Sequence, residues 1–291
     1  MTAKRLKTLR VEKPWGRTRL WPGFADPAPG GESIGEIWLQ DEDDVGSELL
    51  VKYLFTAEKL SIQVHPDDAA ARALGYSCGK DEAWVILAAE PDSTIALGTN
   101  RPVDGPTLRA AALDGSIASL VEWKSVRAGD VFYSPAGTVH AIGAGITLVE
   151  VQQNVDLTYR LYDYGRAREL HLDEGIRVSN ARPFIPNFSP EEVASGRTIL
   201  AEGPKFVLER WKLVGERSIV LPHGTPAWFV PIAGTGVIDD APWQAGEGWL
   251  VRENAKLSFD PGSDVIVAYP LERVSVPILQ KAAVRDFMLV Q

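Results

Sequence analysis

Short apolar runs that end at Gly, Pro, Asn or Asp fill most of the chain, and their close spacing constrains the fold more than any other feature. Runs of this kind indicate β-strands joined by tight turns, and many in succession are typical of an antiparallel sandwich or barrel. The candidate strands of the first half are 33–39, 48–55, 59–65, 82–88, 93–97, 130–134, 139–142, 146–153 and 157–162. The chain is therefore predicted to be mainly β.

Helix signals occur at three places. Residues 66–75 begin at a proline with acids close behind it, and residues 105–115 have Pro near the start and Gly at the end, so both are predicted to be short helices inserted in the β framework. Residues 189–196 are a third possible helix, because Ser189 could cap it and Pro190 would stand at its first position.

A cluster of prolines in NARPFIPNFSP interrupts the strand pattern, which resumes after it. A chain of 291 residues can hold two ordinary domains. We expect a first domain over 1–188, containing the helical insertions, and a smaller β-sandwich over 189–291. The second domain lacks any Gln-x-His arrangement, and His223 has no metal-binding partners near it in sequence, so we expect that domain to be structural.

Composition argues against several classes of partner. The formal net charge of −9 argues against nucleic acid or an anionic membrane, because both reward clustered Lys and Arg. No run approaches the roughly 20 apolar residues that cross a bilayer, and the N-terminal segment lacks the apolar core of a secretory signal. The single cysteine, Cys78, excludes an intrachain disulfide and fits a reducing compartment, so we expect a cytoplasmic location. The acidic run 41–44 is expected to be a solvated loop.

Four polar side chains in strand-like surroundings form a candidate metal site. In SIQVHPDD, Gln63 and His65 share one face with Ser61, since side chains alternate along a strand. Glu82 opens a later strand, and His140 follows the turn of SPAGTVHAIG. Two imidazoles, one carboxylate and one amide oxygen suit zinc or another divalent first-row metal, with a position left open for water or substrate. The strands of a barrel face one interior, so these distant residues can converge there.

The stretch QQNVDLTYRLYDYGR carries Arg160 between two tyrosines. Arginine is always charged and is rarely buried without an anion or a carbonyl to meet. A simpler alternative is a salt bridge with Asp156 or Asp163. Farther along, His171 could reach the edge of the same pocket or have a plain structural role.

Four motifs together resemble those of the type I mannose-6-phosphate isomerases, also called phosphomannose isomerases, in their short bacterial form. They are SIQVHPDD, GKDEAW, SPAGTVHAI and QQNVDLTYRLYDYGR, in the family's order, and the resemblance covers about residues 12–185. It implies a cupin fold, which is a small jelly-roll barrel, with a second cupin-like domain behind it. It also implies that one zinc ion per chain is bound by Gln63, His65, Glu82 and His140.

The resemblance extends to other site residues. It implies that the catalytic residues are Arg160, Lys80 and Glu150, and that substrate and phosphate are bound by Ser61, Lys80, Arg160 and Glu36. Two positions depart from the family's pattern. Val155 stands where serine is usual, near the arginine strand, and Arg17 follows Pro-Trp-Gly where many members have a second glycine.

The implied activity is a zinc-dependent interconversion of mannose-6-phosphate and fructose-6-phosphate, by proton transfer between C1 and C2 through an enediolate. This chemistry needs a base and stabilisation of an oxyanion, and the base is left open among Glu150, Lys80 and metal-bound water. The alternatives are an isomerase of the same design for another phosphosugar, and a metal-binding cupin that senses sugars without turnover. We expect a monomer or weak homo-oligomer, with neither nucleic acid nor membrane as a partner.

Overall fold

The computed structural model contains two compact units and describes residues 2–21, 23–40, 46–222 and 224–281. The first unit is Lys7–Pro190, and the second joins the residues up to Leu6 to the segment from Glu191 onward. The acidic run 41–44 and His223 lie outside the described residues. Strands make up most of the regular structure in both units, so the prediction of a mainly β chain is confirmed.

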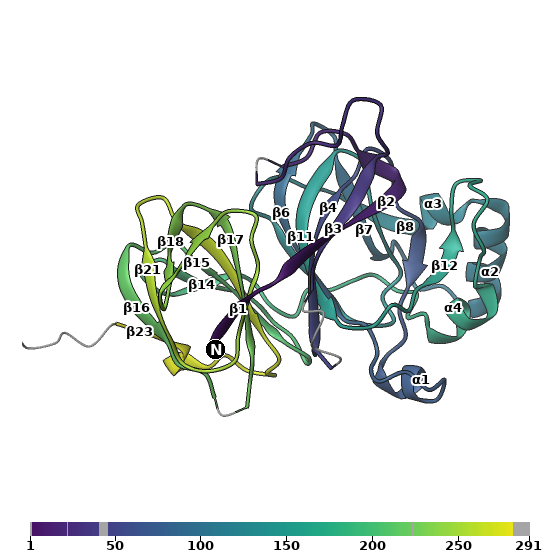
Figure 1. Ribbon diagram of the computed structural model, residues 1–291. Helices are drawn as coiled ribbons and strands as arrows, with labels where there is room; N and C mark the ends of the chain where they lie inside the picture. Colours follow the sequence, from purple (N-terminus) through teal and green to yellow (C-terminus); the bar gives the residue numbers. More distant parts are fainter. Residues whose placement is uncertain (1, 22, 41–45, 223, 282–291) are drawn as a thin grey trace, which may run out of the picture. The chain divides into compact units, whose positions relative to one another are not determined.

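Two antiparallel sheets form the first unit (Figure 1). The six-stranded sheet consists, in order, of β2 (Lys7–Arg17), β3 (Ile34–Gln40), β4 (Leu49–Phe55), β11 (Ile146–Gln153), β6 (Glu82–Ala89) and β9 (Val131–Ser134). The five-stranded sheet consists of β12 (Tyr159–Tyr162), β5 (Ile62–Val64), β10 (His140–Ile142), β7 (Thr94–Thr99) and β8 (Val121–Ser125). Strands far apart in the chain are neighbours in both sheets, which is how distant side chains come together.

The helices of the first unit are α1 (Asp68–Arg72), α2 (Gly105–Asp114), α3 (Ile117–Leu120) and α4 (Leu172–Val178). The first two lie in the segments with the strongest helix signals, and the carboxylates of Asp67 and Asp104 cap them by accepting a backbone N–H three residues on. After α2 the chain turns at Gly115, whose φ of 83° favours glycine. Among the described helices, none is long and apolar enough to cross a membrane.

The helices pack on the outer face of the five-stranded sheet, and this packing decides where the polar residues of β5 point. Ile62 and Val64 are fully buried in an apolar cluster with residues of α2 and α3. Because side chains alternate along a strand, Gln63 must lie on the opposite face, toward the six-stranded sheet. Figure 1 shows α2, α3 and α4 gathered beside β12 and β8. The polar interior therefore lies between the two sheets.

The second unit also has two antiparallel sheets. The seven-stranded sheet consists of β1 (Ala3–Arg5), β20 (Trp249–Val251), β17 (Ala227–Ala233), β22 (Asp264–Tyr269), β15 (Val207–Trp211), β14 (Arg197–Glu202) and β13 (Glu191–Ala194). The five-stranded sheet consists of β19 (Ala241–Gln244), β18 (Thr235–Ile238), β21 (Ala255–Phe259), β16 (Gly215–Ile219) and β23 (Leu279–Lys281), the last preceded by the 3₁₀ helix η1 (Val276–Ile278).

The prediction of a possible helix at 189–196 is wrong, because part of this segment is the strand β13. Gly196, with a φ of 74°, turns the chain so that β13 pairs antiparallel with β14. The pairing supplies backbone hydrogen bonds to a sheet, whereas an isolated helix of this length is marginal in water.

A buried ion pair stabilises the second unit. The guanidinium of Arg197 donates from Nε and Nη2 to the carboxylate of Glu209, at 2.7 and 2.8 Å. Trp211 Nε1 and Tyr269 Oη also donate to this carboxylate, at 2.7 and 2.6 Å. Glu209 is therefore a fully satisfied buried anion, and its loss would leave a buried cation without its partner.

Candidate metal centre and cavity of the first unit

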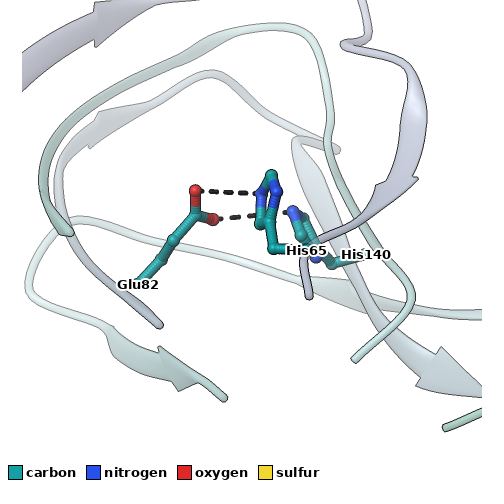
Figure 2. A group of neighbouring side chains, drawn as sticks. All are labelled: His65, Glu82 and His140. Atoms are coloured by element: carbon teal, nitrogen blue, oxygen red, sulfur yellow. Dashed lines mark ion pairs between the residues drawn. The ribbon is translucent and has the colours of Figure 1, made fainter. Parts of the chain in front are cut away.

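Three side chains converge between the two sheets of the first unit (Figure 2). One possible ligand atom from each of His65, Glu82 and His140 lies within 4.8 Å of those of the other two, and all three residues are buried. The Nε2 atom of His65 is 3.1 Å from Glu82 Oε1, and the Nε2 atom of His140 is 3.5 Å from Glu82 Oε2. The carboxylate thus faces both imidazoles at once.

Strand register explains this convergence. His140 opens β10 and stands directly opposite Gln63 of β5, and on the other side of Gln63 stands Arg160 of β12. Directly opposed residues of an antiparallel pair point to the same face, so these three form a row across one sheet. Glu82 opens β6 in the other sheet and meets them from the facing side.

Backbone carbonyls determine which nitrogen of each imidazole carries the proton. Nδ1 of His65 donates to Leu157 O, and Nδ1 of His140 donates to Thr138 O, both at 2.9 Å. A carbonyl can only accept, so each Nδ1 must be protonated and each neutral imidazole keeps its lone pair on Nε2. Burial, reinforced by the Lys80 cation, lowers the pKa of His65 to about 3, and burial also lowers the pKa of His140. Both rings are therefore neutral near pH 7.

Two lone pairs and a carboxylate that face one another could hold a metal ion between them. Nε2 of His65 is buried and has no hydrogen-bond partner, although Glu82 lies beside it. Gln63 completes the set: its Nε2 lies 3.3 Å from His140 Nε2, and its Oε1 accepts from Ser61 Oγ at 3.0 Å. A half-turn of this amide would direct Oε1 toward the cluster. This donor set of nitrogen and oxygen fits a divalent first-row metal ion.

A cavity of about 830 Å³ adjoins the cluster and is lined by six of the other predicted site residues. They are Ser61, Lys80, Glu150, Arg160, Glu36 and the proposed ligand Gln63. Glu82 also lines it, whereas His65 and His140 lie deeper, in contact with Glu82. Lys80 is buried, with its Nζ 3.1 Å from Glu82 Oε1. The structure thus brings every predicted site residue either to this cavity or to the cluster beside it.

Lys52 is a site residue that the sequence analysis missed. Its Nζ lies 3.0 Å from Glu150 Oε1 and 3.8 Å from Glu36 Oε2, and all three residues are buried at the cavity. Burial lowers the pKa of Lys52, but the carboxylates of Glu150 and Glu36 outweigh burial and raise the pKa overall. Burial and the neighbouring Glu82 raise the pKa of Glu150, although Lys52 opposes them. The sequence feature that could have identified Lys52 is its position as a charged residue inside the apolar run ELLVKYLF.

Arg160 forms no ion pair within the described residues, so the alternative of a salt bridge to Asp156 or Asp163 is not observed. Its Nη1 donates to the carbonyl of Glu169 at 2.9 Å, and its Nε is buried without a hydrogen-bond partner. His171 lines the cavity, and its Nδ1 accepts the backbone N–H of Arg160 at 3.3 Å.

The comparisons with known proteins agree with this geometry. No family model matches the chain. A mannose-6-phosphate isomerase of Streptococcus mutans serotype c is 36% identical over 227 residues, which cover 72% of this chain and 70% of that protein. A mannose-6-phosphate isomerase of Bacillus subtilis is 33% identical over 258 residues, which cover 83% of this chain and 77% of the relative. The crystal structure of a mannose 6-phosphate isomerase from Bacillus subtilis has a TM-score of 0.79 at 25% identity, covering 92% of this chain and 99% of that one.

Fold and site together define an enzyme of the cupin class, with a polar cavity between the two sheets of a jelly-roll barrel; the predicted fold class is confirmed. The sequence identity extends over most of this chain and most of each relative. The chain therefore belongs to the mannose-6-phosphate isomerase family, and it is an isomerase.

Proposed function

We propose that the first unit binds one divalent metal ion, zinc by the donor set, and interconverts mannose-6-phosphate and fructose-6-phosphate. The observation that carries the proposal is the pair of neutral Nε2 atoms of His65 and His140 that face Glu82, beside a cavity lined by acids and cations. Gln63 would complete the ligand set. When bound, the ion supplies a Lewis acid that polarises the substrate's oxygen.

Glu150 is the best candidate for the base that moves the proton between C1 and C2. It is buried, it lines the cavity, and its raised pKa gives its carboxylate a higher proton affinity than an ordinary glutamate has. The Nζ atom of Lys80 contacts the carboxylate of Glu82 at 3.1 Å, a position suited to stabilising negative charge. Of the two residues left open by the sequence, the geometry therefore favours Glu150.

The buried lysines are placed to stabilise negative charge. The Nζ of Lys52 holds the carboxylate of Glu150, and that of Lys80 holds Glu82, so both cations are fixed before substrate arrives. Fixed cations beside a developing enediolate oxygen need no reorganisation, which is the source of their catalytic effect. Ser61, Arg160 and Glu36 would bind the rest of the phosphosugar, with Glu36 accepting from a hydroxyl.

The two units would have different roles, with the metal ion and the reaction in the first unit. A structural role for the second unit remains a prediction from the sequence. A cytoplasmic location and a monomeric or weakly oligomeric state remain predictions from the sequence.

One assay tests the proposal. Purified protein is loaded with zinc, given mannose-6-phosphate, and followed for fructose-6-phosphate, while metal content is measured on the same sample. We expect turnover with about one metal ion per chain. Bound metal without turnover of any phosphosugar would indicate a sensor, and turnover confined to another phosphosugar would replace the proposed substrate.

A further inference from the structure

Positive charge is distributed unevenly around the cavity. Beside the metal cluster, the cations of Lys52 and Lys80 are each held by a buried carboxylate. Near β12 the balance differs, because Arg160 forms no ion pair with any residue that the structure describes, and Arg168 shares the buried carboxylate of Asp163 with Arg166. Arg166 also pairs with Glu58, so among the described residues Arg160 is the guanidinium of this group that no carboxylate neutralises by contact.

Arg160 is poorly satisfied for a partly buried cation. One nitrogen donates to the carbonyl of Glu169, while the buried Nε has no hydrogen-bond partner in the part of the chain that the structure describes. Burial, and next the proximity of Arg168, lower the pKa of Arg160, which means that its charged form is disfavoured where it stands. An anion between the two guanidinium groups would reverse this penalty and satisfy the open donors.

Arg168 is held in a fixed orientation by the carboxylate of Asp163. Its Nε and Nη2 donate to Asp163 at 2.6 and 2.7 Å, in a two-pronged contact that fixes the plane of the guanidinium. Asp163 is itself buried and also accepts from Arg166. The Nη1 atom of Arg168 is left without a partner among the described residues, and Arg168 lines the cavity together with Arg160.

We infer that Arg168 is a second phosphate-binding residue, which together with Arg160 holds the phosphate of the sugar at the β12 end of the cavity. The inference rests on the proposed function, and it deepens it by orienting the substrate. With the phosphate at this end, the reacting carbons extend toward Glu150 and Lys52. Lys80 would then stabilise negative charge on the reacting carbons' oxygens and would not bind the phosphate. Two carboxylates, Asp156 and Glu174, also line the cavity, and both would repel an anion that came close to them.

Arg166 provides a matched control. It has the same charge, contacts the same Asp163, and is close in sequence, but its Nη2 donates to Lys59 O and its Nη1 faces Glu58, and it does not line the cavity. Arg168→Gln and Arg166→Gln therefore remove the same charge and loosen the same carboxylate. Only the first removes a donor from the cavity.

The test measures binding of inorganic phosphate by calorimetry, together with kcat and KM for mannose-6-phosphate. Binding is measured on metal-loaded and metal-free protein, since phosphate can also bind a metal ion. We expect Arg168→Gln to weaken phosphate binding about tenfold or more in both forms, as for loss of a hydrogen bond between charged groups. KM should rise similarly while kcat changes little. Arg166→Gln should stay within about twofold of wild type, and Arg168→Lys should retain much of the affinity.

Several results would overturn the inference. They are wild-type protein that binds no phosphate at millimolar concentration, equal effects of the two glutamine variants, or a fall in kcat for Arg168→Gln with phosphate affinity unchanged. If Arg168→Gln does not fold by circular dichroism, the Lys variant decides: phosphate affinity close to that of wild type supports the inference, and affinity lower by tenfold or more contradicts it. Phosphate binding needs no turnover, so an inactive protein that shows these binding differences would refute the isomerase proposal and leave this one standing.

Discussion

Replacement of Lys52 by Met tests the assignment of Glu150 as the base. Glu150 must be a carboxylate to accept a proton, and the Lys52 cation stabilises that carboxylate from 3.0 Å away. Methionine keeps most of the volume of lysine and removes its charge. The pKa of Glu150, already raised by burial and by Glu82, should therefore rise further in Lys52→Met.

The size of the shift follows from the geometry. Two unit charges 3.0 Å apart, at an effective dielectric constant of about 20, attract each other by roughly 5 kcal/mol, which corresponds to about 4 pKa units at 1.36 kcal/mol each. Water and neighbouring groups can rearrange around Glu150 once the Lys52 cation is gone. We therefore expect only part of this shift, about one to two units.

The assay is the pH dependence of kcat/KM with metal-loaded enzyme. Below the pKa of Glu150 the base is protonated, so activity falls on the acid side of the profile. In Lys52→Met this acid limb should lie at higher pH than in wild type, by about one to two units, because the Lys52 cation no longer stabilises the Glu150 carboxylate. The loss of rate should then be largest at low pH and shrink as pH rises. Lys52→Arg, which keeps the charge, should leave the limb near its wild-type position. An unmoved limb in Lys52→Met would refute the role given to Glu150.

Further predictions concern metal, stability and pH. His140→Ala should lose bound metal and activity while its circular dichroism is unchanged; full metal content would remove it from the ligand set. Glu209→Ala should destabilise the second unit by about 3–5 kcal/mol in urea unfolding, because Arg197 is left buried without its partner; a change below 1 kcal/mol would contradict this. Gly98→Ala should cost about 1–3 kcal/mol, because φ is +71° and a Cβ would lie 2.6 Å from the Arg182 carbonyl oxygen; an unchanged urea midpoint would count against it. Metal-free protein should lose stability as pH falls from 6.5 toward about 3, since His65 takes up a proton in the unfolded chain before it does so in the folded one. Urea unfolding across this pH range measures how the free energy of unfolding changes with pH.

The predictable part of the site depends on local patterns. Alternation along SIQVH was enough to predict that Gln63 and His65 share a face, and the buried Ile62 and Val64 show why that face is the inner one. The turn before His140 and the strand start at Glu82 are equally local. The order of the strands, which brings these segments together, was not predicted; the family resemblance implied only the cupin fold and the ligand set.

The part of the site that the sequence did not predict depends on which strands are neighbours. Lys52 stands out in an apolar run, but its partners lie on β3 and β11, and the pairing register cannot be read from one sequence. Arg168 reaches Asp163 through a turn in which Tyr164, a residue other than glycine, has a φ of 54°. This local conformation is uncommon and has no clear sequence signal. The residues before Leu6 likewise carry no pattern that assigns them to the second unit.

The spread of the proposed ligands along the chain has a consequence for how the protein matures. Gln63 and His65 are synthesised well before His140, and His140 reaches them only by pairing β10 with β5. A nascent chain that has not yet emerged past β10 holds at most part of the ligand set, and a barrel with the two sheets apart separates Glu82 from the histidines. Metal capture would therefore come late in biogenesis and would select chains whose first unit is completely assembled.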